Sequence, residues 1–317
     1  TKAIESIMSP ETIQNDGPNG IYSYPLGQYA NTDKTSTDPC AVDANDPNLA
    51  YKFGTMANET VIAQTFNKDL ANEYGKICGN YSLWSNLTIF WGCGTNLHRS
   101  PYNARNHEYY SEDAVLTSGQ AVAFISGGKE YGVIIAPKHL AFNDTEINRL
   151  GVSVFMTEQQ ARENELRGTQ ASIEDAGALG IMTAFNRVGI TAANAHTGLL
   201  KNILRGEWGF KGLESQDFIM NPNYAVLKEY ALNGGTMTTF TGENTMAAVS
   251  EKFAYWTTEN VGQDTELMSA IKQAMTWQAY ALANSNALDG MASSTRLVSV
   301  RTWYDNALVA VQVVFAA

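Results

Sequence analysis

The apolar positions of this chain form several short runs, and each run stops abruptly at polar residues. Residues 133–135 are consecutive β-branched residues, which is typical of a strand buried on both faces. Pro137 cannot donate a hydrogen bond to a neighbouring strand, so this strand is expected to end near Ala136. Three further runs predict strands, at residues 87–91, 181–185 and 210–215.

Between these runs, apolar residues recur at about every fourth position, which predicts amphipathic helices. Thr157 and Gln160 form a capping box, and Asp264 is a candidate cap for a long helix. Alternating strands and helices favour a parallel α/β barrel over an all-α or all-β fold. The helices are predicted at residues 57–77, 114–126, 157–175, 199–206 and 267–282.

A dense group of polar side chains follows the strand at residues 133–136. In parallel α/β folds the carboxyl edge of the sheet is where ligands bind, so this group occupies a place suited to chemistry. The alternative is that the charges form a solvated loop. The group consists of Lys138, His139, Asn143, Asp144, Glu146, Asn148 and Arg149.

Composition and charge exclude several classes of function. The 317 residues, of which 44% are hydrophobic, suffice for one large barrel or two ordinary domains. The net charge of -11 argues against nucleic acid as a partner. The three cysteines are too few for a disulfide framework and fit no zinc spacing, although one bridge remains possible. The first ten residues lack the pattern of a secretory signal and look like an internal start.

Residues 27–50 are polar and rich in Asp, Asn, Thr and Pro, which indicates a surface insertion. Its four aspartates, at positions 33, 38, 43 and 46, are loosely spaced, so a solvated loop is favoured over a cation site. We therefore predict no metal site. The last apolar stretch, residues 303–317, is too short to span a bilayer.

Seven segments resemble glycoside hydrolase family 3, the family of many β-glucosidases and β-xylosidases, and they occur in the family's order. Several long motifs in one order make a chance match improbable. The segments are NDGPNGI at residues 15–21, GTNLHRSPYNARNHEYYSED at 94–113, KHLAFNDTEINR at 138–149, IMTAFNRV at 181–188, LLKNILRGEWGFKG at 199–212, SQDF at 215–218 and, more weakly, ALNGG at 231–235.

The resemblance implies that Asp217 is the catalytic nucleophile of a retaining glycosidase. Such an enzyme also needs a carboxyl group that protonates the departing oxygen, roughly 5 Å from the nucleophile. The family usually has serine before the nucleophile and tryptophan after it, whereas this chain has Gln216 and Phe218. A structural aspartate at a strand end is the alternative. An unmodified carboxylate with a pKa of about 4 would already be ionised at neutral pH.

The resemblance also assigns the residues that bind the sugar, although two have structural alternatives. Asp16 can instead cap its own turn. Arg105 can instead form a salt bridge to Glu108 or Glu112. The family's tyrosine beside the nucleophile is phenylalanine here, which removes one donor, and an arginine usual in the family is Tyr22. The substrate-binding residues are Asp16, Arg105, Lys138, His139, Arg149 and Phe185.

The general acid is expected outside the barrel. The N-acetylglucosaminidase subgroup carries its acid/base histidine in a loop after the lysine-histidine pair, but residues 140–144 read LAFND instead. The chain thus resembles the glucosidase branch, whose acid/base glutamate lies on a second α/β sandwich domain. We expect that domain on another chain or segment.

Together these patterns predict a (β/α)8-type TIM barrel over residues 1–286, followed by an extension at 287–317. Because the first motif begins only about sixteen residues into the chain, we expect the barrel to be incomplete or distorted. The expected function is that of a retaining β-glucosidase acting on oligosaccharides without a cofactor. The alternatives are a β-xylosidase and a non-catalytic carbohydrate-binding barrel, the latter suggested by Tyr22, Phe185, Met237 and the missing acid.

Overall fold

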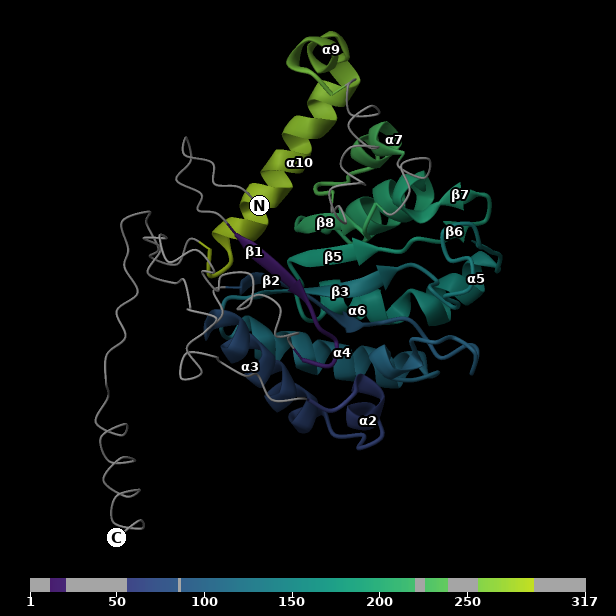
Figure 1. Cartoon of the computed structure of the whole chain (residues 1–317), viewed down its shortest axis with the longest axis vertical. Helices are drawn as coiled ribbons and strands as arrows, with labels where there is room; N and C mark the ends of the chain where they lie inside the picture. Colours follow the sequence, from purple (N-terminus) through teal and green to yellow (C-terminus); the bar gives the residue numbers. More distant parts are fainter. Residues whose placement is uncertain (1–11, 21–55, 85–86, 220–225, 239–255, 288–317) are drawn as a thin grey trace, which may run out of the picture.

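A five-stranded parallel sheet forms the centre of the protein (Figure 1). The structure is a computed structural model that describes residues 12–20, 56–84, 87–219, 226–238 and 256–287. Neighbours in the sheet follow each other along the chain, as in a TIM barrel. The strands are β1 (Ile13–Asp16), β2 (Leu87–Gly94), β3 (Ile134–Leu140), β5 (Gly180–Thr183) and β8 (Leu213–Gln216), in that order.

The fold is α/β, and its sheet is a curled, parallel half-barrel, which fits the expected incomplete TIM-type barrel. In the part of the chain that the structure describes, the parallel sheet has five strands rather than eight. A small second sheet lies beyond the carboxyl ends of β3 and β5. It contains β4 (Ser153–Val154), β6 (Arg187–Val188) and β7 (Thr191–Ala192).

The helices connect the parallel strands and cover the sheet. Figure 1 shows α3, α4 and α6 packed along one face of the sheet and α10 running past it on the other side. The helices are α2 (Glu59–Ala63), α3 (Lys68–Trp84), η2 (Asn106–Glu108), α4 (Ala114–Lys129), α5 (Glu158–Gln160), η3 (Ala161–Glu165), α6 (Arg167–Glu174), η4 (Ala193–Ala195), η5 (Gly198–Glu207), α7 (Leu227–Leu232), α9 (Thr258–Gln263) and α10 (Thr265–Ala283).

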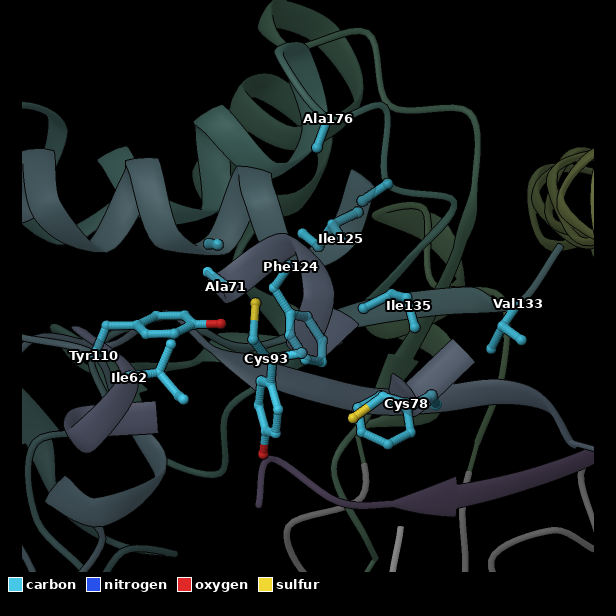
Figure 2. Packing of buried hydrophobic residues seen from close by; sticks show 14 of the residues in the cluster. Ile62, Ala71, Cys78, Cys93, Tyr110, Phe124, Ile125, Val133, Ile135 and Ala176 are labelled. Atoms are coloured by element: carbon cyan, nitrogen blue, oxygen red, sulfur yellow. The ribbon is translucent and has the colours of Figure 1, made fainter. Parts of the chain in front are cut away.

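Both faces of the central strands are buried, as the β-branched run predicts. Phe90 packs against Phe124 on the side of α3 and α4. Ile135 belongs to the same cluster, and Figure 2 shows it near Phe124. Ile89 and Ile134 face the opposite side with the carboxyl end of α10. The helices α3 and α4 approach closely because glycines line their contact: a Cβ at Gly75 would lie 2.0 Å from the Phe124 carbonyl oxygen.

The expectation that the strand at residues 133–136 ends near Ala136 is wrong, because β3 continues through Pro137 to Leu140. The reason is a shift in the strand pairing. Ala136 pairs with Trp91, but Lys138 pairs with Gly94, so Pro137 lies at an irregularity. Bulges are among the few places in a sheet that tolerate a residue without an N–H.

The helix expected at residues 57–77 is also wrong in one respect, since α2 and α3 are separate helices. Phe66 lies in the turn between them with a φ of 52° and is 75% exposed, so it does not join a core stripe. The predicted caps are confirmed: Thr157 accepts a hydrogen bond from the Gln160 N–H, and Asp264 accepts one from the Leu267 N–H.

Several sequence predictions fall outside the described residues. These include the polar insertion at residues 27–50 with its aspartates, Tyr22, Cys40 and the extension predicted at 287–317, of which only Ala287 is described. Cys78 and Cys93 are both buried and both free thiols. Within the described ranges, the structure contains no helix with the length and apolar character needed to cross a membrane.

Candidate active site

The carboxyl edge of the half-barrel brings the predicted site residues together. Their elements are consecutive strands of one parallel sheet, so their carboxyl ends all open onto the same edge. Asp16 ends β1, Lys138 and His139 lie near the end of β3, and Asp217 directly follows β8. The loops after β2, β3 and β5 supply Arg105, Arg149 and Phe185.

Lys138 links the first strand of the sheet to the centre. Its side chain is buried, and its ammonium nitrogen contacts a carboxylate oxygen of Asp16 and lies 3.7 Å from Oε2 of Glu108. A buried ammonium group is stable only when anions or acceptors surround it. Oδ1 of Asp16 also accepts a hydrogen bond from the Gly17 N–H at 3.1 Å, so the alternative turn-capping role is present as well.

Arg105 forms the salt bridge to Glu108 that the sequence leaves open. Its Nε and Nη2 donate to the two carboxylate oxygens at 3.0 and 2.7 Å. Burial alone would raise the pKa of Glu108, but hydrogen bonding from Arg105 and the charge of Lys138 outweigh it and lower that pKa. The loop carrying these residues presses against β2, where a Cβ at Gly94 would lie 2.0 Å from the Glu108 carbonyl oxygen.

Arg149 is held by a carboxylate and an aromatic ring. Its Nη1 donates to Oε2 of Glu146 at 2.6 Å, and its guanidinium carbon lies 4.4 Å from the centre of the Phe185 ring. This is a cation–π contact, to which the ring contributes its face. Oε1 of Glu146 also lies 3.6 Å from Arg105, so this carboxylate joins the two arginines.

His139 is buried beside Asp217, with its Nε2 atom 3.4 Å from Oδ2 of the carboxylate. Asn96 fixes the backbone here by hydrogen bonds to the His139 N–H at 2.9 Å and carbonyl at 3.0 Å. Burial, followed by the charges of Arg105, Lys138 and Arg149, lowers the pKa of His139 well below its ordinary value. The imidazole is therefore neutral at pH 7.

Asp217 is 8% exposed and accepts a hydrogen bond from the Phe218 N–H at 2.8 Å. Burial raises the pKa of Asp217 to about 6, against the opposing effects of that N–H and of the charges of Lys138, Arg105 and Arg149. The assumption of an unmodified pKa of about 4 is therefore wrong for this carboxyl group. At neutral pH the group is still mainly ionised.

Not every residue of the polar group after β3 lies at the site. Asp144 pairs with Arg99 at 2.7 Å, and Arg99 also lies 3.3 Å from the buried carboxylate of Glu165. This pairing anchors the loop instead. Among the described residues, no group of three or more His, Cys, Asp or Glu side chains could hold a metal ion.

The sequence does not single out Tyr109 or Asn96, although both touch His139. Tyr109 belongs to a Tyr-Tyr pair whose two members look alike in the sequence. Only the tertiary structure separates them, since the hydroxyl of Tyr109 faces His139 whereas Tyr110 lies in the apolar cluster of α3 and α4.

The sequence profile of the glycosyl hydrolase family 3 N-terminal domain matches residues 48–237, more than half of the chain. The chain belongs to glycosyl hydrolase family 3. It is 31% identical over 218 residues to a probable β-glucosidase J of Emericella nidulans, a match that covers 69% of this chain and 23% of the relative. A β-glucosidase of Bacteroides ovatus is 35% identical over 209 residues, covering 66% of this chain and 26% of its own length.

Solved structures of the family share the fold. The β-glucosidase 3B of Thermotoga neapolitana in complex with glucose superposes with a TM-score of 0.76 at 24% identity, over 92% of this chain and 38% of that protein. A β-glucosidase of Kluyveromyces marxianus in complex with glucose gives a TM-score of 0.67 at 25% identity, over 97% of this chain and 34% of its own. The family 3 chain thus spans about a quarter to two fifths of these relatives.

Proposed function

We propose that this chain carries the nucleophile side of a retaining β-glucosidase that removes terminal β-D-glucosyl residues from oligosaccharides. The observation that carries the proposal is Asp217, a buried carboxylate at the carboxyl end of a barrel strand with a neutral imidazole 3.4 Å away. Curated relatives that carry the name β-glucosidase support the substrate class.

Asp217 attacks the anomeric carbon of the bound sugar, and the bond from that carbon to the leaving oxygen breaks. The product is a covalent glycosyl-aspartate, which water then hydrolyses with release of the carboxylate. A carboxylate with a pKa of about 6 needs no base to become a nucleophile at pH 7. The charges of Lys138, Arg105 and Arg149 oppose its protonation.

The remaining side chains at this edge bind the glycone. Hydroxyl groups of a sugar can accept from Lys138, His139 and Arg149 and donate to Asp16. Donors that surround the developing oxocarbenium-like state can strengthen their hydrogen bonds as the reaction proceeds. Phe185 provides the face on which the Arg149 guanidinium lies, which fixes the direction of its donors.

The general acid is proposed to come from a second α/β sandwich domain on another segment or chain. Two observations within the barrel support this. The pKa of Glu108 is lowered, so the group is ionised and has no proton to give at neutral pH. The pKa of His139 is lowered as well, so it is not an imidazolium. Neither group suits the protonation of a sugar alkoxide.

Trapping with a 2-deoxy-2-fluoro β-glucoside that has an activated leaving group tests the proposal. In the complete protein we expect inactivation and a glycosyl adduct on the peptide that contains Asp217. An adduct on a different carboxylate, or none at all, would contradict the assignment. The second outcome would instead support a non-catalytic carbohydrate-binding barrel, which the lack of a hydroxyl group at Phe185 favours.

The choice between glucose and xylose depends on the space around one hydroxymethyl group, which is worth only a few kcal/mol. Turnover of an aryl β-glucoside is expected to exceed turnover of the matched β-xyloside. Faster turnover of the xyloside would make the protein a β-xylosidase with the same nucleophile.

A further inference from the structure

A continuous line of contacts runs from the loop after β3 to the proposed nucleophile. The side-chain nitrogen Nδ2 of Asn143 donates to Oε1 of Glu146 at 3.1 Å and to the hydroxyl of Tyr109 at 2.9 Å. That hydroxyl lies 3.2 Å from Nδ1 of His139, whose other ring nitrogen lies 3.4 Å from Asp217. The proposed reaction assigns no role to Asn143 or Tyr109.

The direction of the first hydrogen bonds is set at Glu146. Its carboxylate pairs with Arg149 at 2.6 Å and lies 3.6 Å from Arg105, and an ionised carboxylate only accepts hydrogen bonds. The NH2 group of Asn143 must therefore point toward it. The second hydrogen of the same nitrogen then points at Tyr109.

The direction of the next hydrogen bond follows from that one. The Tyr109 oxygen already accepts from Asn143, and the side chain is fully buried with 0% exposure. The hydroxyl hydrogen is free to be donated, and the acceptor within reach is Nδ1 of His139. A neutral imidazole that accepts at Nδ1 carries its proton on Nε2, the atom that faces Asp217.

We propose that Tyr109 and Asn143 are positioning residues that fix the Nε2-protonated tautomer of His139, so that a neutral donor faces Asp217 and the glycone. The inference deepens the proposed function and rests on it. A neutral donor orients the carboxylate without neutralising it, as an imidazolium would. The other tautomer would turn a nitrogen lone pair toward the carboxylate, and the two would repel each other.

Neutron diffraction from D2O-exchanged crystals of the complete protein reads the tautomer directly. We expect a deuteron on Nε2 of His139, none on Nδ1, and the Tyr109 deuteron on the line to Nδ1. The same tautomer is expected in the Asp217→Asn variant, where the carboxylate charge no longer favours it. A deuteron on Nδ1 in either protein would overturn the proposal.

Two further variants test the two positioning residues. In the Asp217→Asn background, Tyr109→Phe is expected to place deuterons on both ring nitrogens at partial occupancy. The matched control is Tyr110→Phe, which removes the hydroxyl of the adjacent, equally buried tyrosine in the apolar cluster (Figure 2). We expect this control to keep the deuteron on Nε2. Equal tautomer ratios in the two variants would contradict the role of Tyr109.

The Asn143→Asp variant should reverse the direction of the hydrogen bonds between residue 143, Tyr109 and His139. An aspartate carboxylate has no hydrogen to donate, so its oxygen accepts the Tyr109 hydrogen and the tyrosine oxygen becomes free to accept from Nδ1. We expect a deuteron on Nδ1 of His139 in this variant. A purely structural role for Asn143 predicts no change of tautomer.

Activity separates this inference from the proposed function. With the aspartate intact, Tyr109→Phe is expected to lower kcat/KM for an aryl β-glucoside about tenfold, the effect of losing one oriented hydrogen bond. Tyr110→Phe should stay within about twofold. If Asp217 is not labelled but the deuterons lie as expected, the proposed function fails and the tautomer assignment stands. If Asp217 is labelled but the tautomer of His139 does not change in the Tyr109→Phe variant, the tautomer assignment fails and the proposed function stands.

Discussion

Two carboxylates lie three residues apart, Glu214 within β8 and Asp217 directly after it, and their surroundings differ. Asp217 lies at the carboxyl edge, near His139 and subject to the charges of three cationic side chains. Glu214 is fully buried within the strand, where one oxygen accepts from the Thr183 hydroxyl at 2.9 Å and the other has no hydrogen-bond partner. Burial raises both pKa values, to about 6 for Asp217 and about 7 for Glu214.

The charge of Arg205 lowers the pKa of Glu214, but the hydrogen bonds of Arg205 go to other groups. Arg205 donates to the carbonyl groups of Gly234, Phe210 and Gly212, and its guanidinium carbon lies 3.8 Å from the centre of the Trp277 ring. A raised pKa therefore marks burial at both positions, whereas Asp217 also lies 3.4 Å from His139 and is subject to the charges of Lys138, Arg105 and Arg149. This convergence of polar and cationic groups, and not the pKa, distinguishes the candidate nucleophile.

The largest expected effect separates the two carboxylates by activity. Asp217→Asn should lower turnover of an aryl β-glucoside by about 10⁴-fold or more, because no covalent intermediate can form. Glu214→Gln, a substitution of the same kind three residues earlier in the chain, should stay within about threefold. Steady-state kinetics on the complete protein check both, and a comparable loss in the two variants would remove the distinction.

The next effect concerns the general acid, which we propose lies on another segment or chain. The chain expressed alone should retain a larger fraction of activity on a dinitrophenyl β-glucoside than on cellobiose, each relative to the complete protein. General acid catalysis contributes about 10²- to 10⁴-fold, and an activated leaving group needs it less. Equal retention on both substrates would mean that an acid lies within these residues, with Glu108, Glu146 and His139 the first to mutate.

Both carboxyl groups should change the free energy of unfolding in the same direction as the pH rises. A carboxyl group whose folded-state pKa lies above its unfolded value stabilises the fold below the unfolded pKa and loses that contribution as pH rises through the folded one. Between pH 4 and 8, Asp217 and Glu214 thus become destabilising. Asp217→Asn and Glu214→Gln should each raise the free energy of unfolding at pH 8 by about 3 kcal/mol.

Urea unfolding at pH 8 and pH 4 measures this difference. The gain from each variant should shrink at pH 4, where the wild-type carboxyl groups are largely protonated in the fold. A gain that does not depend on pH would show that packing, rather than charge burial, causes it.

The smallest effect is a pH dependence of kcat/KM, which should come from Asp217 and not from Glu214. Below about pH 6, kcat/KM should fall about tenfold per pH unit, because protonated Asp217 is not a nucleophile. Arg149→Met should move this acid limb to higher pH, since the Arg149 charge helps to lower the pKa of Asp217. Arg162→Met, which removes a surface arginine paired with Glu158 and Glu207, is the control. The limb should stay in place in that variant.

Sequence patterns anticipate those parts of the structure that depend on local chemistry. The β-branched run predicts β3, and the caps at Thr157 and Asp264 are confirmed, because each depends on residues close along the chain. The continuation of β3 past Pro137 is not predictable in this way. It depends on how two neighbouring strands shift in register.

The candidate site shows the same limit. Its residues follow from motifs that resemble the family. The structure brings the seven predicted site residues, Asp217 and the six expected to bind the sugar, to the carboxyl edge of the sheet. The pKa of Asp217 and the hydrogen bonds of Tyr109 do not follow, because desolvation and donor direction depend on groups far apart in sequence. Tyr109 and His139 are 30 residues apart, and Lys138 and Asp16 are 122 apart.

The distance along the chain between the outer strands β1 and β8 also affects the order in which the sheet assembles during synthesis. Asp16 and Asp217 are 201 residues apart (217 minus 16), so at 5–20 residues per second a ribosome adds the second roughly 10–40 s after the first. During that interval β1, β2 and β3 can pair, but β5 still exposes the edge that β8 will occupy. The carboxylate of Asp217 loses its water only when β8 docks. Its desolvation therefore belongs to a late step of assembly, and Asp217→Asn should speed that step rather than the pairing of the earlier strands.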